Sequence, residues 1–167
     1  MILKNYYYYF NNVLSEDTCS NIIKYGNSLT EEIGRTGHVP DPVLSKEKLN
    51  FLKKEQRDSN VAWIKEKWLY DIINPYIIEA NQKAEWNFDI DYVEPVQFTK
   101  YKLHQYYNWH CDSSEKLIHN PNDTNVHGKL RKLSCIVFLS NPSDYSGGQL
   151  KFDLRNNPVG CNIVEIK

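Results

Sequence analysis

The sequence lacks every cysteine spacing that would indicate a disulfide framework or a structural zinc site. Its four cysteines, Cys19, Cys111, Cys135 and Cys161, lie far apart, and none belongs to a CxxC pair. A chain of 167 residues can bury a hydrophobic core without covalent cross-links. The pattern therefore indicates a reducing compartment, and we expect a cytoplasmic location.

The chain also has little excess charge and no long apolar run. Its formal net charge is −1, with 20 basic and 21 acidic side chains. Neither sign dominates, which argues against a general binder of nucleic acid or of membrane surfaces. The first residues contain no apolar stretch long enough for a signal peptide, and no later stretch is long enough to span a bilayer. We therefore expect no membrane partner.

Parts of the N-terminal half have the apolar spacing of helices. Ser15 is a good N-cap residue and precedes two acids, and apolar positions repeat at helical spacing from Cys19 to Gly26. A second, longer helical stripe runs from Val61 to Ile73. Pro75 should kink or end this helix, although the apolar pattern continues to Ala80.

Two other N-terminal segments have different patterns. Tyr6 to Phe10 is an aromatic run that favours a β-strand. Residues 34–48 contain two glycines and two prolines, so we expect a surface loop. No internal repeat or low-complexity linker divides the chain, which predicts a single domain over residues 1–167.

After residue 86 the spacing changes to that of β-strands. Val96 and Phe98 alternate with polar residues, and a similar alternation covers Leu150 to Leu154. Leu133 to Leu139 is an apolar run with the length of a buried strand, and Cys161 to Ile166 begins another strand.

Helical segments first and strands second predict an α+β domain. Residues 1–85 are expected to be mainly helical support, and residues 86–167 are expected to supply the strands of a sheet or double-sheet roll.

One short segment carries residue types that bind metals. In a strand, residues two apart point to the same face, so His110 and Asp112 would project into one cavity. An imidazole nitrogen beside a carboxylate oxygen provides two of the three ligands of a facial triad for non-haem Fe(II). The pair alone is weak, because a histidine near an aspartate is more often a surface pair.

Four ordered blocks strengthen this interpretation. They resemble the prolyl 4-hydroxylase-like branch of the Fe(II)- and 2-oxoglutarate-dependent dioxygenases, and most of all its PKHD-type hydroxylases from bacteria and phage. The blocks are Gln97-Phe98-Thr99-Lys100-Tyr101, Tyr107-Asn108-Trp109-His110-Cys111-Asp112-Ser113, Arg131-Lys132-Leu133-Ser134, and Tyr145-Ser146-Gly147-Gly148-Gln149-Leu150.

The resemblance implies a fold, an activity and a site. The fold is a double-stranded β-helix, a cupin-like jelly roll braced by N-terminal helices. The activity is hydroxylation of a prolyl peptide or small molecule, coupled to oxidative decarboxylation of 2-oxoglutarate by O2. His110 and Asp112 would bind Fe(II), and Tyr101 would bind 2-oxoglutarate, with ascorbate as a further cofactor. A bacterial or phage-encoded protein of the cytoplasm is expected, and nucleic acid is not an expected partner.

The sequence departs from the family in two places. The family carries a distal histidine ligand well after the Gly-Gly turn, and a basic residue further on pairs with 2-oxoglutarate. Neither has a counterpart before Lys167, so we expect a domain truncated before the distal histidine, with its C-terminal strands missing. His104 stands where relatives often have glycine, which predicts a differently shaped turn.

Two alternatives stay open. Without the third ligand, the roll would be a catalytically inactive binding module. A zinc site built from His110, Cys111, His119 and His127 has suitable residue types but not the usual structural spacing; His119 and His127 are otherwise interpreted as loop residues. Arg131 is expected to be a solvated charge at the start of a strand.

Overall fold

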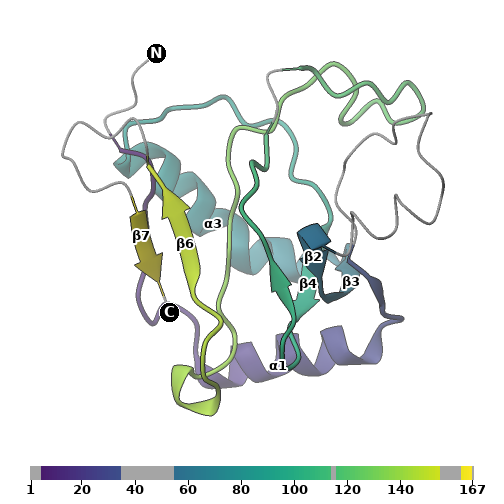
Figure 1. Cartoon of the computed structure of the whole chain (residues 1–167). Coiled ribbons are helices and arrows are strands. Elements are labelled where there is room, and N and C mark those ends of the chain that lie inside the picture. Colours follow the sequence, from purple (N-terminus) through teal and green to yellow (C-terminus); the bar gives the residue numbers. More distant parts are fainter. Residues whose placement is uncertain (1–4, 35–54, 114–115, 155–162, 167) are drawn as a thin grey trace.

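The computed structural model describes residues 5–34, 55–113, 116–154 and 163–166, and these have an α+β fold (Figure 1). The expected α+β class is therefore confirmed. In chain order, the elements are α1 (Glu16–Ser28), β1 (Glu32–Ile33), β2 (Arg57–Asp58), β3 (Asn60–Ile64), α3 (Lys67–Lys83), β4 (Val96–Lys100), β5 (Tyr106–Tyr107), the 3-10 helix η1 (Pro142–Asp144), β6 (Leu150–Asp153) and β7 (Ile163–Ile166).

The strands form three small antiparallel sheets. One sheet has the order β1-β3-β4, and the other two are the pairs β2-β5 and β6-β7. Figure 1 shows β6 and β7 on one side of the molecule and β2, β3 and β4 on the other. Within the described residues these sheets are separate, and no jelly roll is evident among them.

Helix α1 begins where the sequence predicts. The Ser15 side chain accepts a hydrogen bond from the backbone N–H of Thr18 at 3.2 Å, which satisfies one of the free donors of the first turn. Ile22 and Gly26 are buried on one face of the helix. In the described part of the chain, neither α1 nor any other helix is long and apolar enough to cross a bilayer.

The core lies where α1 and α3 meet the three-stranded sheet. Its fully buried members are Ile22, Ile64, Leu69 and Phe98, one each from α1, β3, α3 and β4. Burying a side chain of this size stabilises a fold by roughly 1.5–3 kcal/mol. Four elements therefore depend on one shared cluster.

The predicted strands over Val96–Phe98 and Leu150–Leu154 are confirmed as β4 and β6. The strand predicted from Cys161 is confirmed for β7, and its first two residues lie outside the described part of the chain. Most of the loop predicted over residues 34–48 also lies outside it.

The helix predicted from Val61 begins later than expected. Residues 60–64 form strand β3, and helix α3 starts at Lys67. Val61 and Ile64 are three residues apart and therefore match helical spacing, but both are β-branched and pack in a strand that pairs with β4 along its whole length. Helix α3 then continues through Pro75 to Lys83.

The strand predicted over Tyr6–Phe10 does not form. The segment instead packs its rings between other elements: Tyr7 stacks on Phe152 of β6 at a centroid distance of 6.0 Å, and Phe10 meets Tyr76 of α3 edge to face at 5.3 Å. Contacts between aromatic side chains, and not hydrogen bonds to a neighbouring strand, therefore fix the position of this segment.

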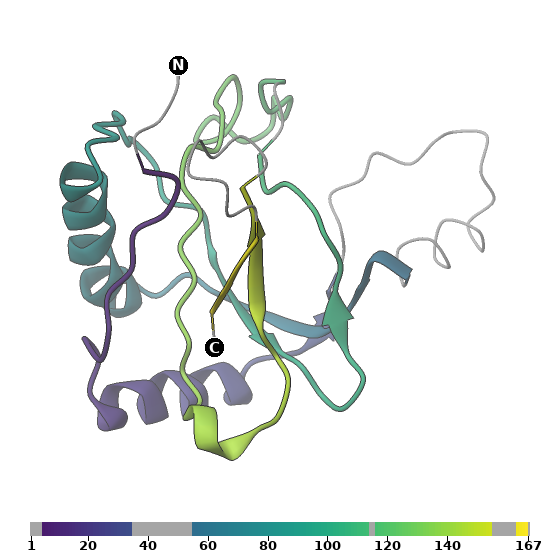
Figure 2. The ribbon, with the colours of Figure 1, turned by 60° about the vertical axis from the view of Figure 1, so that its left-hand side comes forward.

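The buried strand predicted over Leu133–Leu139 is also wrong. The segment has no strand pairing among the described residues, and Ile136, Val137 and Phe138 are exposed. Leu139 does pack against the core. In Figure 2 the light-green chain that leads to η1 runs between α3 and β6.

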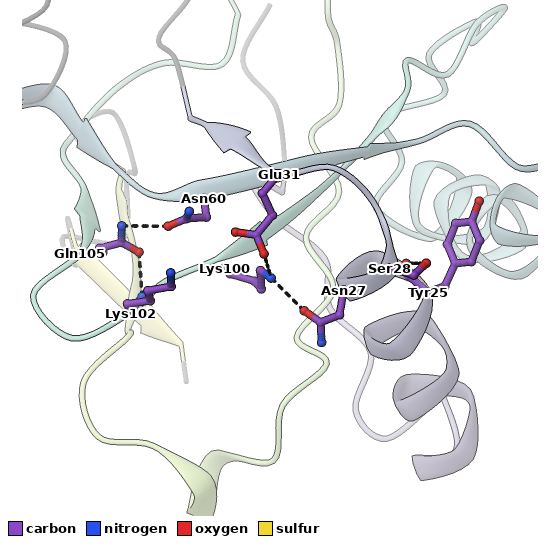
Figure 3. Close-up of polar contacts among 8 residues, drawn as sticks. All are labelled: Tyr25, Asn27, Ser28, Glu31, Asn60, Lys100, Lys102 and Gln105. Carbon is purple, nitrogen blue, oxygen red and sulfur yellow. Dashed lines mark hydrogen bonds and ion pairs between the residues drawn. The ribbon is translucent and has the colours of Figure 1, made fainter.

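A polar network joins the end of α1 to the sheet (Figure 3). Lys100 on β4 pairs with Glu31 and donates to Asn27 at 2.9 Å. In the turn after β4, the Gln105 amide donates to Asn60 at 3.1 Å and accepts from the backbone N–H of Lys102 at 2.8 Å. These contacts fix the turn that leads into β5.

Replacing Gly26 by alanine should destabilise the fold by about 1–3 kcal/mol, because the new methyl group would lie 2.5 Å from the Phe98 ring. Helix propensity alone predicts the opposite, a gain of about 1 kcal/mol. Chemical denaturation measures the difference, with exposed Ser20→Ala on the same helix as the control. A Gly26→Ala protein more stable than wild type would refute this packing.

Glu31 should make the stability of the protein depend on pH. Its hydrogen bond and charge interaction with Lys100 lower the pKa of Glu31, so the folded state favours the ionised carboxylate. Its contribution is present above the ordinary carboxyl pKa and is lost as the pH falls through the lowered value. Wild type should exceed Glu31→Gln in thermal stability near neutral pH, and the gap should close below about pH 4. A gap that is constant with pH would contradict the pairing.

Candidate metal centre

His110 and Asp112 meet, although the strand predicted for them does not form. Strand β5 ends at Tyr107, and the next residues continue without ladder pairing. His110 Nε2 nevertheless lies 3.0 Å from Asp112 Oδ1, and the two side chains are 32% and 47% exposed. The sequence correctly predicted that these two side chains lie together. A turn, and not the alternation of side chains along a strand, brings them together.

Hydrogen bonds to the segment before β2 hold this turn. The Asn108 backbone N–H donates to the Gln56 carbonyl at 2.9 Å, and its side-chain amide donates to the Glu55 carbonyl at 2.8 Å. The Gln56 side chain donates in return to the Trp109 carbonyl at 2.9 Å. These bonds extend the β2-β5 pairing by two residues, up to the first ligand candidate.

A second hydrogen bond orients the imidazole. His110 Nδ1 lies 2.7 Å from the Asn108 carbonyl oxygen, which can only accept, so Nδ1 carries the hydrogen. In the neutral ring, Nε2 then has a free lone pair and faces Asp112. Metal-binding histidines commonly donate their other ring N–H to a backbone carbonyl in this way.

The two facing atoms need a positive charge between them. An unprotonated Nε2 and an ionised carboxylate oxygen are both acceptors, so their 3.0 Å approach is favourable only with a shared proton or a metal cation. Two ligands about 2.1 Å from a metal and at right angles to it lie about 3 Å apart. The observed separation is that of two neighbouring ligands in an octahedral site.

The ring of Tyr107 supports His110 from behind. The two rings are nearly parallel, with an interplanar angle of 10° and centroids 3.6 Å apart. The Arg57 guanidinium lies over the same phenol ring, 4.5 Å from its centroid. Because one face of a ring cannot hold both groups, Tyr107 lies between Arg57 and His110. Burial raises the pKa of Tyr107, and the charge of Arg57 opposes that rise.

Arg57 is held in a buried network. It is paired with Tyr107 across the β2-β5 ladder, and it donates to Ser59 Oγ at 2.8 Å and to Gln97 Oε1 at 2.6 Å. The Ser59 side chain is 1% exposed. Gly34 closes over both groups, since a Cβ at this position would lie 2.3 Å from Ser59 Oγ.

Tyr101 interacts electrostatically with Arg57. It follows β4 directly and is 51% exposed. Partial burial raises the pKa of Tyr101, while the charge and the hydrogen bond of Arg57 oppose that rise. The contacts therefore run from Arg57 through the Tyr107 ring to His110 and on to Asp112.

Arg131 anchors the backbone at Asp112. One edge of its guanidinium, formed by Nε and Nη2, binds the carboxylate of Glu94, and Nη1 donates to the Asp112 carbonyl at 3.4 Å. The Ser113 hydroxyl donates to the Arg131 carbonyl at 2.9 Å. The Arg131 side chain is 51% exposed, in keeping with the predicted solvated charge, and it is also ion-paired with Glu94 and bonded to the backbone of Asp112.

The histidines of the loop after the site lie apart from it. His119 and His127 contact each other edge to face at 5.4 Å, and His127 Nδ1 accepts from the Asn120 backbone. No group of three or more metal-binding side chains is found in the described part of the chain, so the four-residue zinc site is not assembled there.

The turn before β5 has the backbone that glycine favours. His104 has a φ of 65°, in the left-handed region, and the Gln105 backbone N–H closes the turn by donating to the Lys102 carbonyl at 3.0 Å. Histidine therefore adopts here the left-handed backbone that glycine favours. Sequence reasoning did not give Arg57 or Glu94 a role at the site, because their partners are 50 and 37 positions away in sequence.

Replacing Ser59 by alanine should cost about 1–3 kcal/mol of unfolding free energy, because it leaves the Arg57 Nε–H buried without an acceptor. Urea denaturation measures the loss, and Ser20→Ala, on an exposed helix position, controls for the loss of a hydroxyl. Equal stabilities for the two variants would show that the network is not closed as described.

The chain was compared with known proteins. No protein-family model matches it, and searches of the curated proteins and of the solved structures found no significant match. The assignment of the site therefore depends on the motif resemblance and on the geometry of His110 and Asp112.

Proposed function

We propose that this chain carries the metal-binding part of an Fe(II)- and 2-oxoglutarate-dependent dioxygenase of the prolyl 4-hydroxylase-like type. The observation that supports this most strongly is the approach of His110 Nε2 to Asp112 Oδ1, with Nδ1 committed to a backbone carbonyl. A divalent cation would relieve the contact between two acceptors and would use both as ligands. Iron bound there supplies the oxidative chemistry.

The residues of the chain have three tasks in this activity. His110 and Asp112 would be the residues of this chain that bind the metal, through an imidazole nitrogen and a carboxylate oxygen. Tyr101 donates a hydrogen bond to 2-oxoglutarate from the adjoining strand end. Tyr107 would support the imidazole of His110, and Arg131 would hold the backbone at Asp112. The substrate class is a prolyl peptide or a small molecule, and ascorbate would maintain the reduced metal.

The same proposal includes the fold. Three exposed apolar side chains, Ile136, Val137 and Phe138, support a fold larger than the separate sheets, since exposed apolar surface marks sites that another segment or a partner covers.

A second candidate function is a binding module without catalysis. It is favoured by the lack of a third metal-binding side chain near His110 and Asp112 among the described residues. For this function the two residues would be structural. A His110→Ala, Asp112→Ala protein that retains partner binding would support it.

Succinate production from 2-oxoglutarate should require Fe(II), O2 and both candidate ligands. His110→Ala or Asp112→Ala should lower the rate by about 100-fold or more, since loss of a ligand exceeds the 10–100-fold cost of disturbing its neighbours. A His119→Ala, Asp89→Ala protein loses the same residue types away from the site and should keep the wild-type rate.

A wild-type protein that binds no Fe(II) and forms no succinate would refute the dioxygenase proposal. Succinate formation that persists in the His110→Ala protein would refute the ligand assignment.

A further inference from the structure

Residues 118–129 form a lobe that closes on itself. At its base, the Ile118 backbone N–H donates to the Lys129 carbonyl, and the Gly128 N–H donates to the Ile118 carbonyl, both at 2.9 Å. The lobe contains no helix or strand. Local hydrogen bonds of this kind therefore determine its shape.

One histidine side chain takes part in this closure. The Asn120 backbone N–H donates to Nδ1 of His127 at 3.1 Å. A backbone N–H can only donate, so Nδ1 has no hydrogen, and the hydrogen of the neutral ring is on Nε2. His110 has the opposite arrangement, because its Nδ1 faces a carbonyl oxygen and carries the hydrogen. The closed lobe therefore requires a neutral His127 in one particular tautomer.

Protonation of His127 would remove this acceptor. An imidazolium has a hydrogen on both ring nitrogens, so Nδ1–H and the Asn120 N–H would then face each other as two donors. The ring of His119 lies edge to face with that of His127, with centroids 5.4 Å apart, so a second proton would add repulsion between like charges. Histidine is the side chain whose charge ordinarily changes between pH 5 and 8. Mild acid should therefore weaken the contact that closes the lobe.

The charged side chains around the ring have other partners. Asp123 is the acid of the lobe, and its Oδ1 accepts from a backbone N–H of the same turn at 3.0 Å. Lys129 pairs with Asp91 at 2.6 Å and lies over the Tyr92 ring, in the segment packed beside the lobe. None of the ion pairs between described residues includes either imidazole of the lobe. A carboxylate that would stabilise a protonated His127 is therefore not in place there.

We propose that residues 118–129 form an acid-sensitive switch, in which protonation of His127 breaks its bond to Asn120 and opens the lobe. The base of the lobe leads directly to Arg131, which bonds to the Asp112 carbonyl. Opening the lobe would therefore loosen a support of Asp112. The switch does not depend on the dioxygenase proposal, since the bond between Asn120 and His127 involves neither candidate iron ligand.

Amide hydrogen exchange, measured by NMR between pH 8 and pH 5, tests the proposal. Rates are divided by the intrinsic exchange rates at each pH, and the Gly34 amide, which donates to the Ser59 carbonyl, is the internal reference. Wild type is compared with His127→Asn, which can accept from Asn120 and does not titrate, and with His127→Ala, which has no acceptor. His104→Asn removes an exposed histidine outside the lobe and is the matched control. Nitrogen-15 spectra of the wild-type imidazoles give the tautomer of His127.

Protection of the Asn120, Ile118 and Gly128 amides should fall roughly 3- to 10-fold in wild type as the pH falls, the factor for losing one hydrogen bond of typical net strength. His104→Asn should show the same fall. His127→Asn should keep its protection at both pH values, and His127→Ala should have low protection at both. The imidazole spectra at pH 8 should show the hydrogen of His127 on Nε2.

Three results would overturn the proposal. Hydrogen on Nδ1 of His127 at pH 8 would show that its bond to Asn120 does not form. Wild-type protection that does not change with pH would show that protonation leaves the lobe closed. An equal fall in His127→Asn would assign the pH dependence to another group, for which Asp123 is the first candidate.

Discussion

The candidate site depends on the ring of Tyr107, which lies between the buried Arg57 guanidinium and the His110 imidazole. The β2-β5 pairing brings Arg57 and Tyr107 together, and the stacked rings then fix the plane of the imidazole. Arg57 is in turn locked by Ser59 and Gln97, so the position of His110 traces back to the buried end of the three-stranded sheet. A candidate metal ligand on a short turn is thereby supported by the buried network around Arg57.

Asp112 has a separate support. Its backbone is bound by Arg131, which the Glu94 carboxylate holds in place. The two ligand candidates are therefore oriented by two independent sets of contacts that converge at a distance of 3.0 Å. These contacts would orient both candidate ligands before a metal binds. Such preorganisation suits a site in which the protein fills only some of the coordination positions.

Local signals in the sequence predicted a good part of this structure. The Ser15 cap predicted the start of α1, and the alternation at Val96–Phe98 predicted β4. The His-x-Asp spacing correctly predicted that the two side chains meet. Signals of this type act within a few residues and are readable from one sequence.

The failures involve contacts between distant segments. The three-residue spacing of Val61 and Ile64 matches a helix, but pairing with β4 makes this segment a strand. The role of Arg57 depends on a partner 50 positions away in the chain. Leu133–Leu139 has the composition of a buried strand, but only Leu139 reaches the core cluster in the described structure. Composition reports what a segment can bury, whereas the neighbouring segments decide whether it is buried.

The most direct measurement on the central claim is paramagnetic broadening of histidine and tyrosine ring signals by Mn(II) in NMR spectra. We expect substoichiometric Mn(II) to broaden the ring signals of His110 and Tyr107 first, while those of His119 and His127 stay sharp. Broadening of His119 and His127 ahead of His110, or no selective broadening at any ring, would contradict a metal site at His110 and Asp112.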